Sequence, residues 1–230
     1  MLQIPTVSRL QMVDVLHLPL AGDPRLDGSP AYRAAQRLGP GDSPPASSPA
    51  AAFLAARRRF LAGERIDMRA LATELGVSRP TLYRWTGPRE QLLADVLFAL
   101  SDATFAAAIR DTDHLEGAER LLAVFRRHVA AIVTSHPLQT FLRQETQVAL
   151  RILTGRHASV NPRTVARVAG LYRAEAEAGR FHPPADVDTL AFAVVCLAES
   201  FIYNDASAAL EPEVERAAAV VALLLGAESD

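Results

Sequence analysis

The amino-acid sequence predicts an all-α fold. From Ser48 onward, apolar residues recur at spacings of three and four, which is the period of an amphipathic helix. No stretch alternates apolar and polar residues as a half-buried strand would. Gly and Pro residues fall between the apolar segments, at positions where helices typically stop.

Residues 1–47 differ in composition from the remainder. Eight of the fifteen prolines lie within the first 49 residues, with Gly and Ser among them, as in "LGPGDSPPASSP". Such a segment buries too little apolar surface to form a core, so we expect a disordered extension. It is either a tail, a segment added by a start codon assigned too far upstream, or an arm for a DNA groove. Its four Arg and four Asp leave it uncharged, which disfavours the arm.

Two short helices with a Gly between them follow the first helix of the main body. Asp67 and Ser78 are expected N-caps, and Gly76 lies where a tight turn needs positive φ. Helices this short are marginal alone, so they must pack on longer neighbours. This is the helix-turn-helix pattern. The expected helices span about 49–62, 68–75, 79–85 and 88–109.

The outward face of the third of these helices is basic and polar, because Leu82 turns the opposite face inward. Residues 51–95 carry eight Arg against five acidic residues, whereas residues 96–230 carry twelve against seventeen. A basic segment on an acidic body suits a polyanion such as DNA, although the two helices alone also fit a plain corner of an all-α domain. The candidate DNA-binding residues are Arg69, Ser78, Arg79, Thr81, Tyr83, Arg84, Trp85 and Arg89.

The segment "IDMRALATELGVSRPTLYRWTGPREQLLADVL" resembles the DNA-binding domain of the TetR family of transcriptional regulators. The shared pattern is an Ala-xxx-Gly-Val-Ser turn, a Thr-Leu-Tyr helix, and a basic residue with Glu at the start of the fourth helix. Two positions depart from it. Thr86 stands where the family usually has Phe, with Trp85 one residue earlier, and Arg89 replaces the usual Lys. Trp85 is therefore either a DNA contact or an anchor between the third and fourth helices.

The composition implies an extension over 1–47, and the resemblance implies a DNA-binding domain over 48–97 and a helical ligand-binding and dimerisation domain over 98–230. In that last part, helices are expected near 115–134, 137–153, 162–178, 186–204 and 211–226. The last two are apolar on more than one face, as in "LAFAVVCLAESFI" and "VERAAAVVALLLGA". Burial on two sides favours a homodimer interface over a monomer core.

Several polar residues interrupt the apolar faces of this part. A carboxylate on a buried face is costly unless it is paired or protonated. Glu145 and Glu199 are therefore either members of core ion pairs or hydrogen bonds, or polar groups in an apolar ligand pocket. The candidate ligand-binding residues are Phe125, His128, Phe141, Glu145, Tyr172, Phe192, Glu199 and Tyr203.

Three stretches, "TLYRWTG", "FLRQETQVALRILT" and "AESFIYND", also resemble TetR-family regulators associated with the degradation of lactone quorum signals. This resemblance implies a small hydrophobic ligand with a polar head, such as a lactone or acyl compound. The function expected from the sequence is a ligand-responsive regulator, in most such proteins a repressor, bound as a homodimer to a near-palindromic operator. The alternatives are a small-molecule carrier whose helix-turn-helix is not functional, and a constitutive regulator without a ligand.

Other function classes find little support. The single cysteine, Cys196, excludes an internal disulfide and a multi-Cys zinc site, and the six His show no metal-ligand spacing. No glycine-rich phosphate loop or nucleophile elbow is present, so we expect neither an enzyme nor a cofactor or metal. No apolar run is pure enough for a membrane span, which predicts a cytoplasmic protein.

Overall fold

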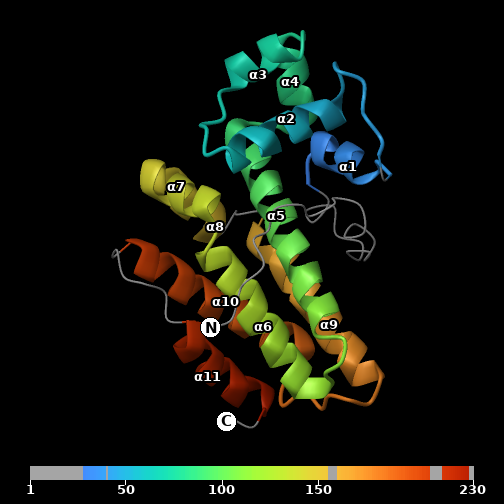
Figure 1. Ribbon diagram of the computed structural model, residues 1–230, viewed down its shortest axis with the longest axis vertical. Helices are drawn as coiled ribbons and strands as arrows, with labels where there is room; N and C mark the ends of the chain where they lie inside the picture. The colour runs from blue at the N-terminus through green and yellow to red at the C-terminus, as the bar shows by residue number, and fades with distance from the viewer. Residues whose placement is uncertain (1–27, 40, 155–159, 208–213, 228–230) are drawn as a thin grey trace.

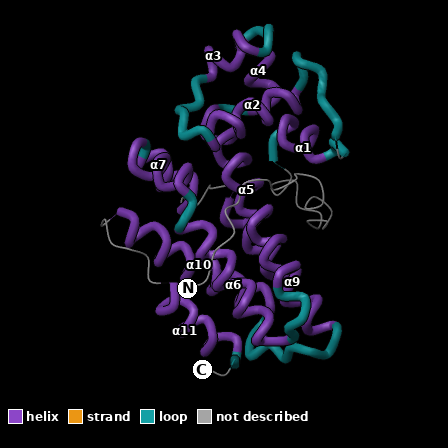
Figure 2. Tube along the Cα trace, viewed as in Figure 1, coloured by secondary structure: helices purple, strands orange, loops and turns teal. Residues whose placement is uncertain are grey.

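The computed structural model describes residues 28–39, 41–154, 160–207 and 214–227, and every regular element within these ranges is a helix (Figures 1 and 2). The prediction of an all-α fold is confirmed. The helices are α1 (Pro30–Gln36), α2 (Pro49–Leu61), α3 (Met68–Glu74), α4 (Arg79–Thr86), α5 (Arg89–Asp111), α6 (Gly117–Val133), α7 (His136–Gln144), α8 (Thr146–Thr154), α9 (Val160–Glu177), α10 (Val187–Ser207) and α11 (Val214–Leu225).

Helix α5 is the central element of the fold. Its first half packs against α2 and α4, and its second half lies beside α6 and α9 (Figure 1). The buried apolar residues form an upper cluster around α1–α5, α7 and α8 and a lower cluster around α5, α6 and α9–α11. Because one rigid helix runs through both, it mechanically joins the upper and lower parts of the molecule.

The described part of α5 is also long and apolar enough to cross a membrane by length and composition alone. The expectation that no run reaches that length and purity is therefore wrong for α5. Half of its most apolar stretch is buried inside the protein, which is how the core helix of a globular fold passes the same test. We interpret α5 as a core helix.

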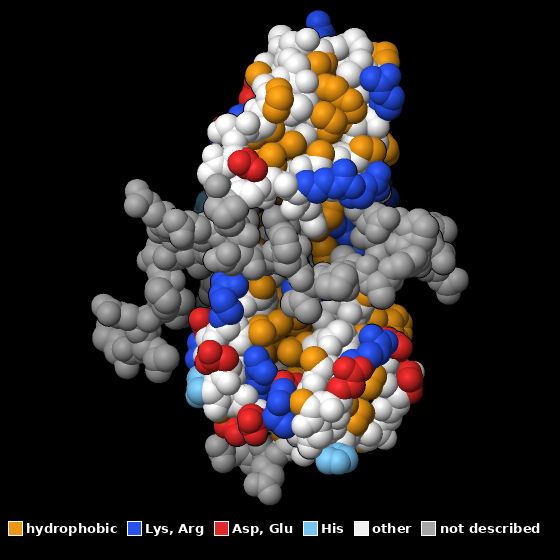
Figure 3. All heavy atoms as spheres, turned by 90° about the vertical axis from the view of Figure 1, so that its right-hand side faces the viewer, with side chains coloured by type: hydrophobic (Ala, Val, Ile, Leu, Met, Phe, Trp, Pro, Cys, Tyr) orange, Lys and Arg blue, Asp and Glu red, His pale blue; other side chains and the backbone are white. Residues whose placement is uncertain are grey.

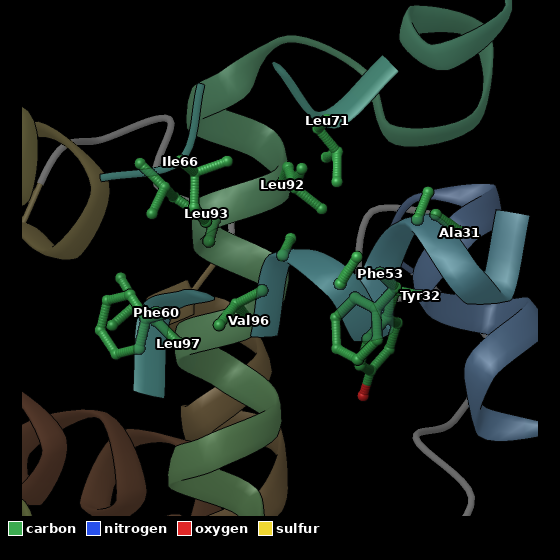
Figure 4. Packing of buried hydrophobic residues seen from close by; sticks show 14 of the residues in the cluster. Ala31, Tyr32, Phe53, Phe60, Ile66, Leu71, Leu92, Leu93, Val96 and Leu97 are labelled. Carbon is green, nitrogen blue, oxygen red and sulfur yellow. The ribbon is translucent and has the colours of Figure 1, made fainter. Parts of the chain in front are cut away.

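The expectation of a disordered segment over residues 1–47 is wrong for the described residues from 28 onward. Ser29 caps α1 by accepting a hydrogen bond from the Tyr32 amide at 3.2 Å, and Pro30 occupies the first turn. Ala31, Tyr32 and Ala35 are buried, and the Tyr32 ring meets the Phe53 ring edge-on with centroids 5.5 Å apart (Figure 4). The segment folds because the apolar face of α1 packs against α2. Residues 1–27 lie outside the described residues.

The single helix expected near 137–153 is two helices, α7 and α8, which meet at Glu145. The Glu145 backbone has φ −132° and ψ 42°, outside the helical region. The Thr146 hydroxyl donates to the Leu142 carbonyl at 2.7 Å, taking the acceptor that the Thr146 amide would use in a continuous helix. The hydroxyl thus satisfies the Leu142 carbonyl where the helix breaks.

Candidate DNA-binding surface and ligand pocket

The turn between α3 and α4 has the geometry that the sequence predicts. The Asp67 carboxylate accepts from the Ala70 amide at 2.8 Å, and the Ser78 hydroxyl accepts from the Thr81 amide at 3.3 Å. The Ala70 amide also holds the pKa of Asp67 below its ordinary value. Gly76 has φ 65°, where other residues are strained. Both caps and the turn are thus confirmed.

Helix α4 divides cleanly into a buried and an exposed face. Leu82 and Thr86 are fully buried, and the Thr86 hydroxyl donates to the Leu82 carbonyl at 3.0 Å. Thr86 therefore occupies a core position by satisfying its hydroxyl within the helix. Arg79 and Arg84 are exposed, and the Tyr83 side chain is 42% exposed. Two guanidinium groups and a phenol consequently face solvent from one short helix, which suits phosphate and base-edge contacts.

The other polar candidates around α4 differ in what they offer. Arg69 is exposed on α3, whereas the Ser78 and Thr81 hydroxyls lie 2.8 Å apart and hydrogen-bond each other. Trp85 is half-buried and packs against the upper cluster. Of the two roles left open for Trp85, the packing favours the anchor between α4 and α5.

Arg89, for which a DNA-phosphate contact is predicted, makes two hydrogen bonds within the protein at the start of α5. Its Nε donates to the Ile66 carbonyl at 2.7 Å, and its Nη2 donates to Glu145 Oε1 at 2.6 Å. The side chain is only 19% exposed. Glu145, 56 residues away in sequence, reaches Arg89 through the break between α7 and α8. Arg89 thus ties the α2–α3 loop to the α7–α8 junction.

The ion pair with Arg89 also decides between the two alternatives for Glu145. Its second oxygen lies 3.8 Å from Arg65 Nε, so the carboxylate is neutralised within the protein. Of its two alternatives, Glu145 is thus a member of an ion pair, with Arg89 as the partner. Beside it, Arg151 on α8 pairs with Glu90 on α5 at 2.9 Å. The start of α5 is thus fixed electrostatically to the α7–α8 junction.

The remaining ligand candidates do not converge on one cavity. Phe141 belongs to the upper cluster and meets the Phe60 ring at 5.6 Å, whereas Phe125 and Tyr172 belong to the lower cluster. Phe192 on α10 is 54% exposed in the single chain, and its place in a pocket lining stays a prediction. Glu199 is half-buried on α10; burial, and after it the charge of Glu199, raises the pKa of the Cys196 thiol. The Tyr203 side chain lies outside the described residues.

Among these candidates, His128 lines a pocket in the described structure. This shallow pocket lies between α5, α6 and α9 and has a cavity volume of about 10 Å³, room for about one water molecule. That volume is below the roughly 300–1,000 Å³ typical of drug-sized ligand sites. Its lining comprises Phe98, Ser101, Asp102, Phe105, His128, Thr164, Arg167 and Val168. The α5 residues of this set are spaced three and four apart on one helix face. This spacing is visible in the sequence, but the ligand candidates were sought on the later helices, so the α5 residues were missed.

A buried charged cluster beside the pocket was also absent from the sequence-based expectations. Asp95 on α5 and Arg163 on α9 are both 0% exposed and lie 2.8 Å apart. The Arg163 guanidinium stacks between the Tyr32 and Phe98 rings, with centroids 4.4 and 3.8 Å away. Burial raises the pKa of Tyr32 to about 12. Sixty-eight residues separate the two charges, so no local pattern indicates the pair.

Charges are unevenly spread over the face seen in Figure 3. Arginine side chains line the edge of the upper part, whereas acidic and basic side chains alternate over the lower part. This agrees with the excess of Arg in residues 51–95 and of acidic residues in residues 96–230. The basic end of the molecule is the end that carries α3 and α4 (Figure 1).

Comparisons with known proteins agree with this architecture. Residues 116–226 match the family model described as the tetracyclin repressor-like C-terminal domain. The structure of the R. erythropolis transcriptional repressor QsdR, from the TetR family, matches with a TM-score of 0.73 and 28% sequence identity, over 79% of this chain and 95% of that chain. A search of curated proteins finds no significant match. The structural match extends well beyond the residues that the family model covers.

Proposed function

This chain belongs to the TetR family of transcriptional regulators, and we propose that it is a homodimeric repressor that leaves its operator when a small, mainly apolar molecule binds. Proteins of this family are DNA-binding regulators and not enzymes. The observation that carries the proposal is the division of α4, with Leu82 and Thr86 fully buried and Arg79, Tyr83 and Arg84 facing solvent. A helix held so firmly can present those side chains to a major groove.

We assign dimerisation to α10 and α11. The inner face of α11 is buried within the chain through Ala217, Val221 and Leu225, whereas Leu223 is 75% exposed and Val220 is 38% exposed. Phe192 on α10 is exposed as well. Apolar side chains on both sides of a helix indicate a second surface that needs cover. Two copies are also needed, because one helix-turn-helix buries too little DNA surface for useful affinity.

In this proposal the ligand binds within the domain over residues 98–230, and a lactone or acyl compound is the favoured class of ligand. The support is the resemblance of three sequence stretches to lactone-associated regulators. Ligand binding would favour a conformer in which the two α4 helices are wrongly spaced for the operator, and α5 would transmit the change. A shift from ~1:99 to ~99:1 requires about 10⁴-fold preference of the ligand for one conformer. A cytoplasmic location follows from this role.

The proposal is tested by binding the purified protein to genomic DNA fragments at two salt concentrations and sequencing those retained at the higher one. We expect one near-palindromic site. Weak retention without sequence preference, vanishing with salt, would favour a small-molecule carrier instead. Retention of one site that no lactone or acyl compound reverses would favour a constitutive regulator.

Variants of α4 sharpen this test. Replacing Arg84 or Tyr83 by Ala removes an exposed contact group, so operator affinity is expected to fall at least about tenfold, with thermal stability unchanged. Arg110→Ala is the matched control, because Arg110 is equally exposed at the far end of α5. An equal loss of affinity in the control would mean that general charge, rather than α4, binds the DNA.

A further inference from the structure

The upper helices are attached to the lower part of the molecule on two sides of α5. On the side of α7, the Phe60 and Phe141 rings meet at 5.6 Å and Arg89 binds Glu145. On the other side, α1 packs against α2 and α4 and reaches α9 (Figure 1). Packed helices can slide past one another by small shear motions, so α5 alone does not fix the angle between the two parts. The contacts on its two sides do.

The contact of α1 with α9 is built around a buried charge. The Tyr32 ring covers one face of the Arg163 guanidinium at 4.4 Å, and the Phe98 ring covers the other at 3.8 Å. Arg163 is 0% exposed, and its Nε and Nη2 have no hydrogen-bond partner among the described residues. Stacking on aromatic rings stabilises a guanidinium that has lost its water. The position of Tyr32 is therefore fixed relative to α9.

The backbone that leads into α1 is held at the same place. The Ser29 amide donates to Asp95 Oδ2 at 3.0 Å, and Arg33 Nη1 donates to the Gly28 carbonyl at 2.8 Å. A Cβ atom on Gly28 would lie 2.8 Å from Asp95 Oδ1 and 3.3 Å from Arg163 Nη1. The φ of Gly28 is 68°, which is strained for other residues. Glycine therefore lets the chain lie directly against the buried ion pair.

Helix α1 is equally well attached to the DNA-binding helices. The Tyr32 ring meets the Phe53 ring of α2 edge-on, and Ala35 is buried beside them. The loop after α1 ends near Ser47, whose hydroxyl donates at 2.6 Å to the carbonyl of Leu75, the C-cap of α3. Because α1 also packs against α4, it joins the helix-turn-helix to α9.

We propose that the α1 contact, formed by Gly28, Ser29 and Tyr32 against Asp95 and Arg163, fixes the angle of α4 relative to the lower part of the molecule. In a dimer joined through its lower parts, this angle sets the distance between the two α4 helices. It thereby sets the half-site spacing that the protein accepts. Successive base pairs lie about 3.4 Å apart, so a displacement of α4 by that amount corresponds to one base pair. The inference rests on the proposed homodimeric repressor, whose operator spacing it specifies.

Gly28→Ala and Gly41→Ala are matched variants, because both glycines have positive φ but a Cβ at Gly41 would meet no atom within 4 Å. Spin labels at Arg84→Cys on α4 and Ala174→Cys on α9, in a Cys196→Ser background, report the distance between the two parts. Full-length labelled protein is diluted with unlabelled chains, without DNA, so that the distance is measured within one chain. We expect one narrow distance in the parent and in Gly41→Ala. In Gly28→Ala the distance should broaden or shift by about 3 Å or more.

Tyr32→Leu and Tyr32→Phe form a second pair, which decides if Gly28→Ala fails to fold. Leu removes the ring face that covers Arg163, whereas Phe keeps it. We expect Tyr32→Leu to broaden the distance and Tyr32→Phe to leave it unchanged. An unchanged distance in either Gly28→Ala or Tyr32→Leu, measured on folded protein, would overturn the proposal. So would an equal change in Gly41→Ala.

The accepted spacing is then measured on the recovered operator, with its own spacing and with one base pair inserted between the half-sites. The wild-type protein should bind the longer operator at least about tenfold more weakly, since the insertion moves one half-site by about 3.4 Å and turns it by about 35°. Gly28→Ala should lose most of this discrimination. A merely structural role would lower both affinities alike, because it reduces only the folded fraction, and would refute the proposal. If the protein recognises no operator, the repressor fails, and the distance measured without DNA still decides whether the α1 contact positions α4.

Discussion

Replacing Asp95 by Asn is expected to destabilise the protein strongly, although the two side chains have nearly the same shape. Every contact of the Asp95 carboxylate is with a donor. Oδ1 accepts from Arg163 Nη1 at 2.8 Å and from Gln91 Nε2 at 3.2 Å, and Oδ2 accepts from the Ser29 amide at 3.0 Å. Asn offers one acceptor oxygen, so its NH₂ group must face one of these donors.

The size of the effect follows from burial. Asp95 and Arg163 are both 0% exposed, so the substitution leaves the guanidinium in the core without a counter-charge. Removing one partner of such a pair typically costs about 3–5 kcal/mol of unfolding free energy. At about 2–4 °C per kcal/mol for a chain of this size, Tm should fall by about 6–20 °C.

The assay is thermal and urea unfolding at one fixed protein concentration, because dimerisation makes stability depend on concentration. Asp113→Asn is the control, since Asp113 is 80% exposed and should change stability by less than about 0.5 kcal/mol. Adding Arg163→Met to Asp95→Asn removes the unpaired charge and should recover part of the loss. A loss below about 1 kcal/mol for Asp95→Asn, or no recovery in the double variant, would refute the reasoning.

Three further outcomes are expected. The pKa of His128 in the folded protein, about 4, lies below its ordinary value of 6.5, so the unfolded chain binds more protons between these two pH values. The free energy of unfolding is therefore highest above pH 6.5 and should fall by up to about 3 kcal/mol as the pH drops to 4. In urea unfolding, His128→Phe should reduce this pH dependence. Leu223→Glu should convert the dimer to monomers in sedimentation equilibrium, and an intact dimer would exclude α11 from the interface. Glu145→Gln should lower the free energy of unfolding by about 1–2 kcal/mol and weaken operator binding, because Arg89 loses its anionic partner. Glu90→Gln, in the exposed pair with Arg151, should change neither quantity. Equal effects of the two variants would show that the Arg89–Glu145 ion pair contributes no more than an exposed pair.

Local sequence patterns determined the helix-turn-helix almost completely. Asp67, Gly76 and Ser78 act within a few residues of their own positions, through caps and a turn whose geometry depends on the backbone nearby. The inward position of Leu82 follows from helical period alone. Ser29 and Pro30 are also a local N-terminal helix signal for α1, but the Pro-rich composition around them led to the prediction of disorder.

The tertiary structure alone decided where the polar groups go. Arg89 and Glu145, and likewise Asp95 and Arg163, meet across 56 and 68 residues, and their pairing depends on how α5 packs against α8 and α9. The composition of the pocket has the same origin, since α5, α6 and α9 each supply part of it. Helical period tells which residues share a face of one helix, but not which face of another helix lies opposite. For that reason the sequence determined the helix-turn-helix, a local motif, whereas the pocket, built between distant helices, had to come from the packing.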